Sequence, residues 1–317
     1  MKTLPDGCVH TVITSPPYYG LRDYDGGDAE IGGEETPEQY VQKMVEVFRE
    51  ARRILRDDGT LWLNLGDSYA TTSGGMEQLR KMGGATPAYG KIKYAEGYKG
   101  VSQKGKAGAK RSGLKHKDLI GIPWRVALAL QADGWYLRQD IIWSKPNPMP
   151  ESVTDRCTKS HEYIFLLSKN PKYYYDAEAI KEPVAETTVN RLSQKNLPNQ
   201  IGSTRVPGKT NGNMKAVGST DKRNKRSVWT ITTKPYKGAH FATYPKDLIE
   251  PCVLAGCPVG GTVFDPFTGS GTTAVVALTN NRKYIGTELN PEYVKLAETR
   301  ISQEVPATLE GLFVEQP

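Results

Sequence analysis

The chain has 317 residues, four cysteines and a formal net charge of +7. This length is enough for one large α/β domain or two modest ones, and four cysteines are too few for a disulfide framework. No apolar run approaches the roughly 20 residues that cross a bilayer, and the chain does not open with a signal-peptide pattern, so we expect a soluble, cytoplasmic protein without a membrane partner.

The positive charge is concentrated in two segments. Residues 80–117 contain eleven Lys or Arg and one acidic residue, and residues 181–237 contain twelve and three. Both segments are rich in Gly, Ser, Thr and Asn, which predicts loops or segments that order on a partner. They are either solvated insertions or, as the clustering of Lys and Arg favours, a polyanion-binding surface with nucleic acid as its partner.

The predicted elements alternate between strand and helix along the chain. Residues 9–14 form a strand that leads into "SPPYY", and residues 36–55 form an amphipathic helix capped by Thr36 with Pro37 at its first position. "RDDG" ends that helix. The remaining elements follow as a strand over 60–67, a helix and turn over 119–137, a strand and loop over 138–148, a strand over 162–169, a helix over 246–257, a buried strand over 261–265, a helix over 272–280 and a strand over 282–289. This alternation predicts a doubly wound, mostly parallel α/β sheet, with ligand sites at the carboxyl ends of its strands.

A glycine-rich turn follows the short buried strand that ends at Asp265. "DPFTGSGTT" places Gly269 and Gly271 just before a helix, where a ligand can approach the backbone and free N–H groups. The stretch matches neither the P-loop nor the G-x-G-x-x-G fingerprint, which favours a nucleotide-like ligand without phosphates. Glu288 ends the next strand, where Rossmann-like folds bind ribose hydroxyls. The alternative interpretation is a purely structural turn.

Two motifs together resemble a known family. "TSPPYYG" at residues 14–20, followed much later by "DPFTGSGTT" at residues 265–273, resembles the amino-group DNA methyltransferases, which transfer a methyl group from S-adenosylmethionine to an exocyclic base nitrogen. The motif order resembles the permuted β class, and the resemblance covers nearly the whole chain. It implies a Rossmann-like class I methyltransferase fold, with a catalytic part over residues 1–180 that carries a basic insertion at about 70–117, a target-recognition region over 181–237 and a cofactor-binding part over 238–317.

The resemblance implies catalytic roles for Ser15, Pro16, Pro17 and Tyr18. An exocyclic amine is a poor nucleophile because its lone pair is delocalised into the ring. Ser15 Oγ and the Pro16 carbonyl would accept its two N–H bonds and aim the lone pair at the methyl group, while the double proline holds that carbonyl rigid. Tyr18 would stack on a base that has left the duplex. Tyr19 is either a packing residue or a contact to the base or cofactor.

The same resemblance implies a cofactor pocket for S-adenosylmethionine. Glu288 would bind the ribose, and Leu289 would cover the adenine. Phe241 either lines this pocket or only packs. Asn64 and Asp67 end a strand near the expected site, and we interpret them as structural residues, with a catalytic role as the alternative. The methionine part would be surrounded by Asp265, Phe267, Gly269, Ser270, Gly271 and Thr272.

Target recognition is assigned to the second basic segment. Its expected DNA contacts are Lys222, Arg223, Lys225 and Arg226. Ser15 favours cytosine-N4 as the target because Ser is typical of the cytosine-N4 enzymes at this position, and adenine-N6 is the alternative. Methylation of RNA or protein, and an inactive DNA-binding protein, are further alternatives. Double-stranded DNA is the implied partner, while a cognate restriction endonuclease and a homodimer are left open.

Two other sets of residues are considered as active sites and are not interpreted as such. Pro251-Cys252 resembles the nucleophile pair of cytosine-C5 methyltransferases, but it precedes the cofactor motif and lies on the apolar face of a predicted helix. We therefore interpret Cys252 as a buried structural residue. His116, His161 and His240 form no carboxylate, histidine and nucleophile pattern, and no metal site is implied.

Overall fold

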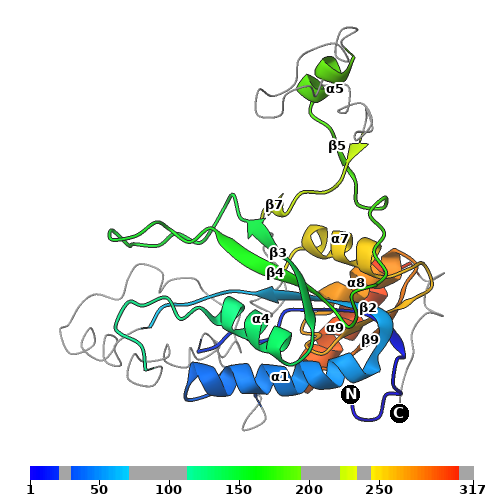
Figure 1. The fold of residues 1–317 in the computed structure, drawn as a ribbon. Helices are drawn as coiled ribbons and strands as arrows, with labels where there is room; N and C mark the ends of the chain where they lie inside the picture. The colour runs from blue at the N-terminus through cyan, green and yellow to red at the C-terminus, as the bar shows by residue number, and fades with distance from the viewer. Residues whose placement is uncertain (21–29, 71–112, 194–221, 234–243, 307–317) are drawn as a thin grey trace.

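The computed structural model describes residues 1–20, 30–70, 113–193, 222–233 and 244–306. In these ranges the main sheet has seven strands in the order β7-β3-β4-β2-β1-β8-β9 (Figure 1). β4 is antiparallel to β2 and β3, and the other neighbouring pairs are parallel, so the predicted doubly wound, mostly parallel sheet is confirmed. The strands are β1 (Val9–Thr14), β2 (Leu55–Leu65), β3 (Tyr136–Ser144), β4 (His161–Ser168), β7 (Val228–Thr230), β8 (Thr262–Asp265) and β9 (Lys283–Gly286).

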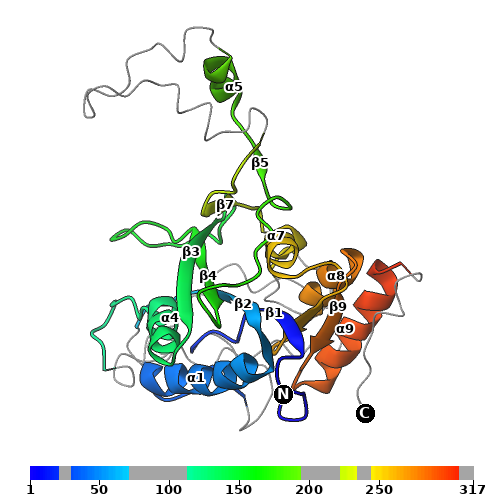
Figure 2. The same cartoon turned by 45° about the vertical axis from the view of Figure 1, so that its right-hand side comes forward.

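Helices cover both faces of this sheet (Figure 2). One buried cluster joins the sheet to α1 (Pro37–Ile54) and α4 (Ile122–Ala132), and the other joins it to α7 (Lys246–Gly256) and α8 (Thr272–Thr279). In β2, Leu61 and Leu63 belong to the first cluster and Trp62 to the second, as the period of two in a strand requires. A further helix, α9 (Pro291–Glu304), packs against α8 and was not predicted from the sequence.

Helix α1 begins and ends close to its predicted bounds, but the strand after it starts earlier than predicted. The Thr36 hydroxyl accepts from the Gln39 N–H, the Gln39 side chain accepts from the Thr36 N–H, and Pro37 occupies the first turn. The helix ends at Ile54, directly before Leu55 and "RDDG", close to its predicted end, but β2 starts at Leu55 rather than at the predicted Thr60 and runs through these residues. Leu55 already pairs with Val9 of β1, so the sheet takes up the chain directly after the helix.

The second basic segment contains structure that its composition did not predict. β5 (Glu182–Pro183) pairs with β6 (Lys222–Arg223), and α5 (Glu186–Leu192) follows β5. β5 and α5 project from the body of the molecule, whereas β7 joins the edge of the main sheet (Figures 1 and 2). Most of the first basic segment and Phe241 lie outside the described residues. In the described part, no helix is both long and apolar enough to span a bilayer.

Cys252 is confirmed as a buried residue of α7. Its side chain is 0% exposed, and its thiol donates to the Leu248 carbonyl at 3.6 Å. Burial raises the pKa of Cys252 far above that of a free thiol, and burial likewise raises the pKa of Cys257 to about 12. Because the thiolate is the nucleophilic form, Cys252 is poorly suited to attack a base.

We expect iodoacetamide to alkylate Cys157, which is exposed, and to spare Cys252 and Cys257 in the folded protein. Peptide mass spectrometry after brief labelling at mildly alkaline pH measures the modification at each site. Labelling in guanidinium chloride is the control, since unfolding should make every thiol reactive. Equal labelling of Cys252 and Cys157 in the folded state would contradict the structural role of Cys252.

Candidate active site

The serine and double proline of the first motif lie at the carboxyl end of β1, between β2 and β8. Ser15 directly follows Thr14, the last residue of this strand. Ser15 Oγ donates to the Tyr18 hydroxyl at 3.4 Å, and the Pro17 carbonyl accepts from the Tyr40 hydroxyl at 2.8 Å. Tyr40 belongs to α1, so this helix holds the loop in place from one face of the sheet.

Tyr18 belongs to a cluster of polar side chains that come from several strands. Its hydroxyl donates to Glu162 Oε2 at 2.8 Å and to Asn64 Oδ1 at 3.2 Å. Asn64 Nδ2 donates to the same Glu162 oxygen at 3.2 Å, and the Lys145 ammonium forms an ion pair with Glu162 Oε1. Because β4 is antiparallel, its first residues reach the edge where β1, β2 and β3 end, and this brings Glu162 to the loop.

Close packing positions both tyrosines of the motif. A Cβ atom on Gly66 would lie 2.4 Å from Tyr18 Cε2, so the ring occupies space that only glycine leaves free. Tyr19 is 2% exposed, lies with its ring centroid 5.7 Å from that of Tyr40, and donates to the Glu35 carbonyl. Of the two roles considered for Tyr19, the structure therefore supports packing.

Asp265 joins the serine loop to the glycine-rich turn. Its carboxylate accepts from Thr14 Oγ1 at 2.5 Å, Thr273 Oγ1 at 2.6 Å, the Phe267 N–H at 3.0 Å and the Tyr244 hydroxyl at 3.2 Å. Asp265 is 0% exposed, and this burial raises the pKa of its carboxyl, while the four donors act in the opposite direction. Asp265 therefore lies beneath the turn as its support.

The turn presents backbone at the carboxyl end of β8. Gly269 and Gly271 have φ values of +53° and +76°, and Gly271 is the N-cap of α8. Glu288 lies two residues beyond the end of β9, where its Oε2 accepts from the Gly269 N–H at 2.8 Å and its Oε1 from the Asn290 N–H at 3.0 Å. Leu289, beside it, is 55% exposed. Backbone N–H groups, a carboxylate and an apolar side chain thus lie together.

Arg300 of α9 binds the glycine-rich turn on its buried side. Its Nη1 donates to Thr272 Oγ1 at 2.8 Å, to Ser270 Oγ at 3.1 Å and to the Ser270 carbonyl at 3.2 Å. Ser270 and Thr272 are both nearly fully buried, so their hydroxyls face the protein interior.

Phe267 of the same turn is half-buried and packs against the core cluster of α1 and α4.

The two polar residues near the end of β2, Asn64 and Asp67, have different roles. Asp67 accepts from the N–H groups of Gly121 and Ile122 at the start of α4, which agrees with its interpretation as structural. Asn64 contacts Tyr18 and Glu162 and so lies in the site, although it was interpreted as structural.

Several side chains that build the site were not predicted from the sequence: Tyr40, Lys145, Glu162, Tyr244 and Arg300. The signal available for Lys145 and Glu162 was their position at the predicted ends of strands, in "SKPNP" and "HEY". Tyr40 and Arg300 lie on helix faces, and Tyr244 precedes a helix, positions that carry no such signal.

β5 and β6 form a two-stranded antiparallel ribbon, here called the projecting ribbon. The expected DNA contacts lie on β6 and just after it, at the base of this ribbon. Arg223 Nε and Arg226 Nε lie 3.0 and 2.9 Å from the same oxygen of Glu182, and Lys225 Nζ lies 5.0 Å from the centroid of the Trp229 ring. Burial of Glu182 opposes its ionisation, but the two guanidinium groups outweigh it and lower the pKa of this carboxyl. Arg223 and Arg226 therefore hold the ribbon together through Glu182, and Lys222 lies beside them on β6.

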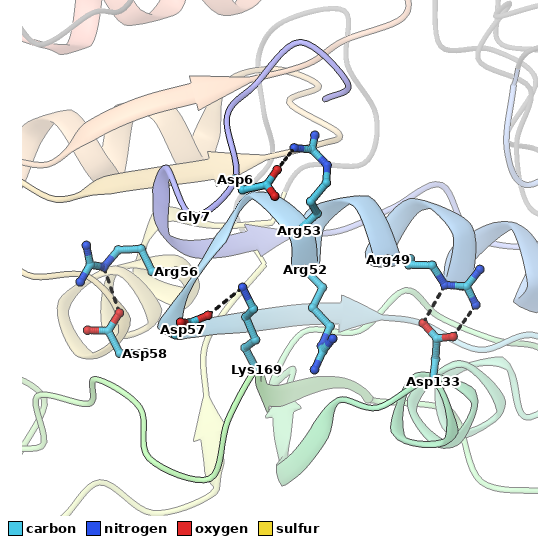
Figure 3. Close-up of a pocket in the computed structure, with 10 residues that line it drawn as sticks. All are labelled: Asp6, Gly7, Arg49, Arg52, Arg53, Arg56, Asp57, Asp58, Asp133 and Lys169. Carbon is cyan, nitrogen blue, oxygen red and sulfur yellow. Dashed lines mark hydrogen bonds and ion pairs between the residues drawn. The ribbon is translucent and has the colours of Figure 1, made fainter.

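A cavity lies at the opposite edge of the sheet from the candidate site. It has a volume of 880 Å³ and is lined by the segment before β1, the end of α1, the start of β2 and the residues directly after α4 and β4 (Figure 3). Its charged groups are largely paired with one another, as in Arg49–Asp133, Arg53–Asp6, Arg56–Asp58 and Lys169–Asp57. Open α/β sheets bind ligands at the carboxyl ends of parallel strands, so this cavity is not the candidate active site. In the described ranges, no cluster of three or more His, Cys, Asp or Glu could hold a metal.

Comparisons with known proteins agree with this geometry. A family model described as DNA methylase matches residues 9–299. The chain is 46% identical to the type II methyltransferase M.Cfr9I of Citrobacter freundii over 96% of this chain and 85% of that protein. It is 48% identical to the type II methyltransferase M.SmaI of Serratia marcescens over 92% of this chain and 83% of that protein.

Two solved structures share the fold. A putative DNA modification methylase of Thermus thermophilus, in complex with S-adenosyl-L-methionine, superposes with a TM-score of 0.56 at 21% identity, over 96% of this chain and 90% of that chain. The cytosine-N4-specific PvuII DNA methyltransferase superposes with a TM-score of 0.56 at 17% identity, over 99% and 90%. The serine loop and the glycine-rich turn lie on adjacent strands of the shared fold, and the family model spans nearly the whole chain. The chain belongs to the DNA methylase family.

Proposed function

We propose that this chain transfers a methyl group from S-adenosylmethionine to the exocyclic N4 of a cytosine that is flipped out of double-stranded DNA. The observation that carries the proposal is the hydrogen bond from Thr14 to Asp265, which fixes the serine loop beside the glycine-rich turn. The reaction is a direct attack of the amine on the methyl group, without a covalent enzyme intermediate. The buried, unreactive Cys252 is consistent with this mechanism.

The residues at the turn fit S-adenosylmethionine. Glu288 is a half-buried carboxylate at the end of a strand, which suits a ribose diol, and the exposed Leu289 beside it suits an adenine face. The backbone at Gly269 and Gly271, supported from below by Asp265, would line the methionine part. When bound, this cofactor supplies an electrophilic methyl group.

The serine loop acts on the target amine. Ser15 Oγ and the Pro16 carbonyl accept its N–H bonds, which favours a tetrahedral nitrogen with its lone pair free. The Tyr18 ring stacks on the flipped base, and hydrogen bonds to Asn64 and Glu162 hold the Tyr18 hydroxyl in place.

Ser15 supports cytosine-N4 over adenine-N6, because serine at this motif position is typical of the cytosine-N4 enzymes. The relatives named as type II methyltransferases support a role in restriction and modification, in which a cognate endonuclease cuts the unmethylated site. Residues 181–237 are the proposed recognition region, since they combine the projecting ribbon with clustered Lys and Arg.

We expect purified protein incubated with duplex DNA and labelled S-adenosylmethionine to yield labelled N4-methylcytosine. Nucleoside mass spectrometry after complete digestion identifies the product. Boiled protein is the control. Labelled N6-methyladenine would keep the reaction class and overturn the assigned base, whereas label in RNA or protein but not in DNA would overturn the substrate.

Ser15→Ala removes one acceptor from the target amine. We expect the single-turnover rate to fall by about 10²–10³-fold, the range seen when one positioned transition-state hydrogen bond is removed, while binding of cofactor and DNA persists. Ser302→Ala, on the exposed face of α9, is the matched control and should keep the wild-type rate. A near-normal rate for Ser15→Ala would remove Ser15 from the mechanism.

Thr14→Val removes one donor to the buried Asp265 carboxylate without removing bulk. Leaving a buried acceptor short of a donor costs about 1–3 kcal/mol, so we expect kcat/KM for the cofactor to fall by about tenfold or more. Thr11→Val, in the same strand, removes a buried hydroxyl that donates to the Thr60 carbonyl instead. Steady-state kinetics measures kcat/KM for the cofactor, and urea unfolding measures the stability of both variants. If Thr11→Val lost as much kcat/KM as Thr14→Val, the loss would come from lower stability and not from the contact to Asp265.

A further inference from the structure

Glu162 is a carboxylate at the serine loop to which the sequence motifs give no role. Its Oε2 accepts from the Tyr18 hydroxyl at 2.8 Å and from Asn64 Nδ2 at 3.2 Å, and its Oε1 pairs with the Lys145 ammonium. The Tyr18 hydroxyl in turn lies 3.4 Å from Ser15 Oγ. A continuous chain of hydroxyls thus connects Ser15, which is proposed to contact the target amine, to a carboxylate.

We propose that Glu162 receives the proton that the target amine loses, by way of Ser15 and Tyr18. This inference rests on the proposed function. Glu162 acts through two hydroxyls and touches neither substrate nor cofactor, so it is a positioning residue for the proton.

The reaction balances along this path. The amine lone pair forms the new N–C bond, the C–S bond of the sulfonium breaks, and its electron pair stays on sulfur. The methylated nitrogen then carries a positive charge and one proton too many. It gives that proton to Ser15 Oγ, Ser15 gives its own proton to the Tyr18 oxygen, and Tyr18 gives its proton to Glu162 Oε2.

A carboxylate is basic enough to take the proton from the methylated nitrogen. A ring-attached nitrogen with four bonds is a strong acid, because losing the proton restores conjugation of its lone pair with the ring. An ionised carboxylate is therefore a sufficient base. Glu162 contacts Lys145 after β3, Tyr18 from the serine loop and Asn64 from β2, and it interacts electrostatically with Lys159 before β4.

The other carboxylates at this edge, among the residues that the structure describes, have different partners. Asp265 supports the glycine-rich turn, Glu288 binds the N–H groups of Gly269 and Asn290, and Asp67 caps α4. The Glu162 side chain is 16% exposed and that of Lys145 is 17% exposed, so the acquired proton can leave to solvent afterwards.

The test uses Glu162→Gln, Tyr18→Phe and the double variant of the full chain. Glu162→Gln keeps an oxygen that accepts from Tyr18 but removes the basicity, and Tyr18→Phe keeps the ring but breaks the path. We expect each single variant to lose about 10²-fold or more of the single-turnover rate with saturating S-adenosylmethionine and duplex DNA, the range for one proton-transfer group. The double variant should be no slower than the slower single variant, because both remove the same path. Losses that multiply would overturn the proposal.

Three readouts separate the relay from a structural role. Fluorescence of 2-aminopurine at the target position should show unchanged base flipping in Glu162→Gln, and loss of flipping would overturn the proposal. The pH dependence of the rate should differ between the wild type and Glu162→Gln, because only the wild type has an ionisable group at this position. Glu151→Gln, which replaces an ion-paired carboxylate in the connection from β3 to β4, should keep the wild-type rate.

A wild-type rate in Glu162→Gln would also overturn the proposal. Failure of the proposed function is distinguishable from all of these results, because the wild-type protein itself would then transfer no methyl group to DNA.

Discussion

The hydrogen bond between Thr14 and Asp265 is the contact on which the candidate site depends. It joins residues 251 positions apart in the chain, at the ends of two adjacent parallel strands. Asp265 is fully buried and accepts from four groups, so any change at this point disturbs the serine loop and the glycine-rich turn together. A charged group is costly to bury, and it is retained where several donors compensate it.

The reversal of a single strand completes the site. β1, β2 and β3 end at one edge of the sheet, and β4, which is antiparallel, begins there. This topology brings Glu162 from the start of β4 to Tyr18 after β1, and places Lys145 next to it after β3. An all-parallel sheet would have placed the beginning of β4 at the opposite edge, where the ion-paired cavity lies.

The residues of the second motif divide into those that present backbone and those that support it. Gly269 and Gly271 expose the turn, whereas the buried hydroxyls of Ser270 and Thr272 bind Arg300 beneath it. Such supporting contacts hold a binding loop rigid and thereby reduce the entropy lost when a ligand binds. The motif therefore encodes a shape as well as a set of contacts.

The sequence by itself determined the alternation of strands and helices, the capped start of α1 and the two motif positions, because these depend on local periodicity, on N-cap chemistry and on proline and glycine. Only the tertiary structure decided the packing role of Tyr19, the paired state of Arg223 and Arg226, and the partners of Asn64 and Glu162. These features depend on which strand ends meet and in which direction each strand runs. Strand order and direction arise from pairing between segments far apart in the chain, which no local pattern of residues specifies.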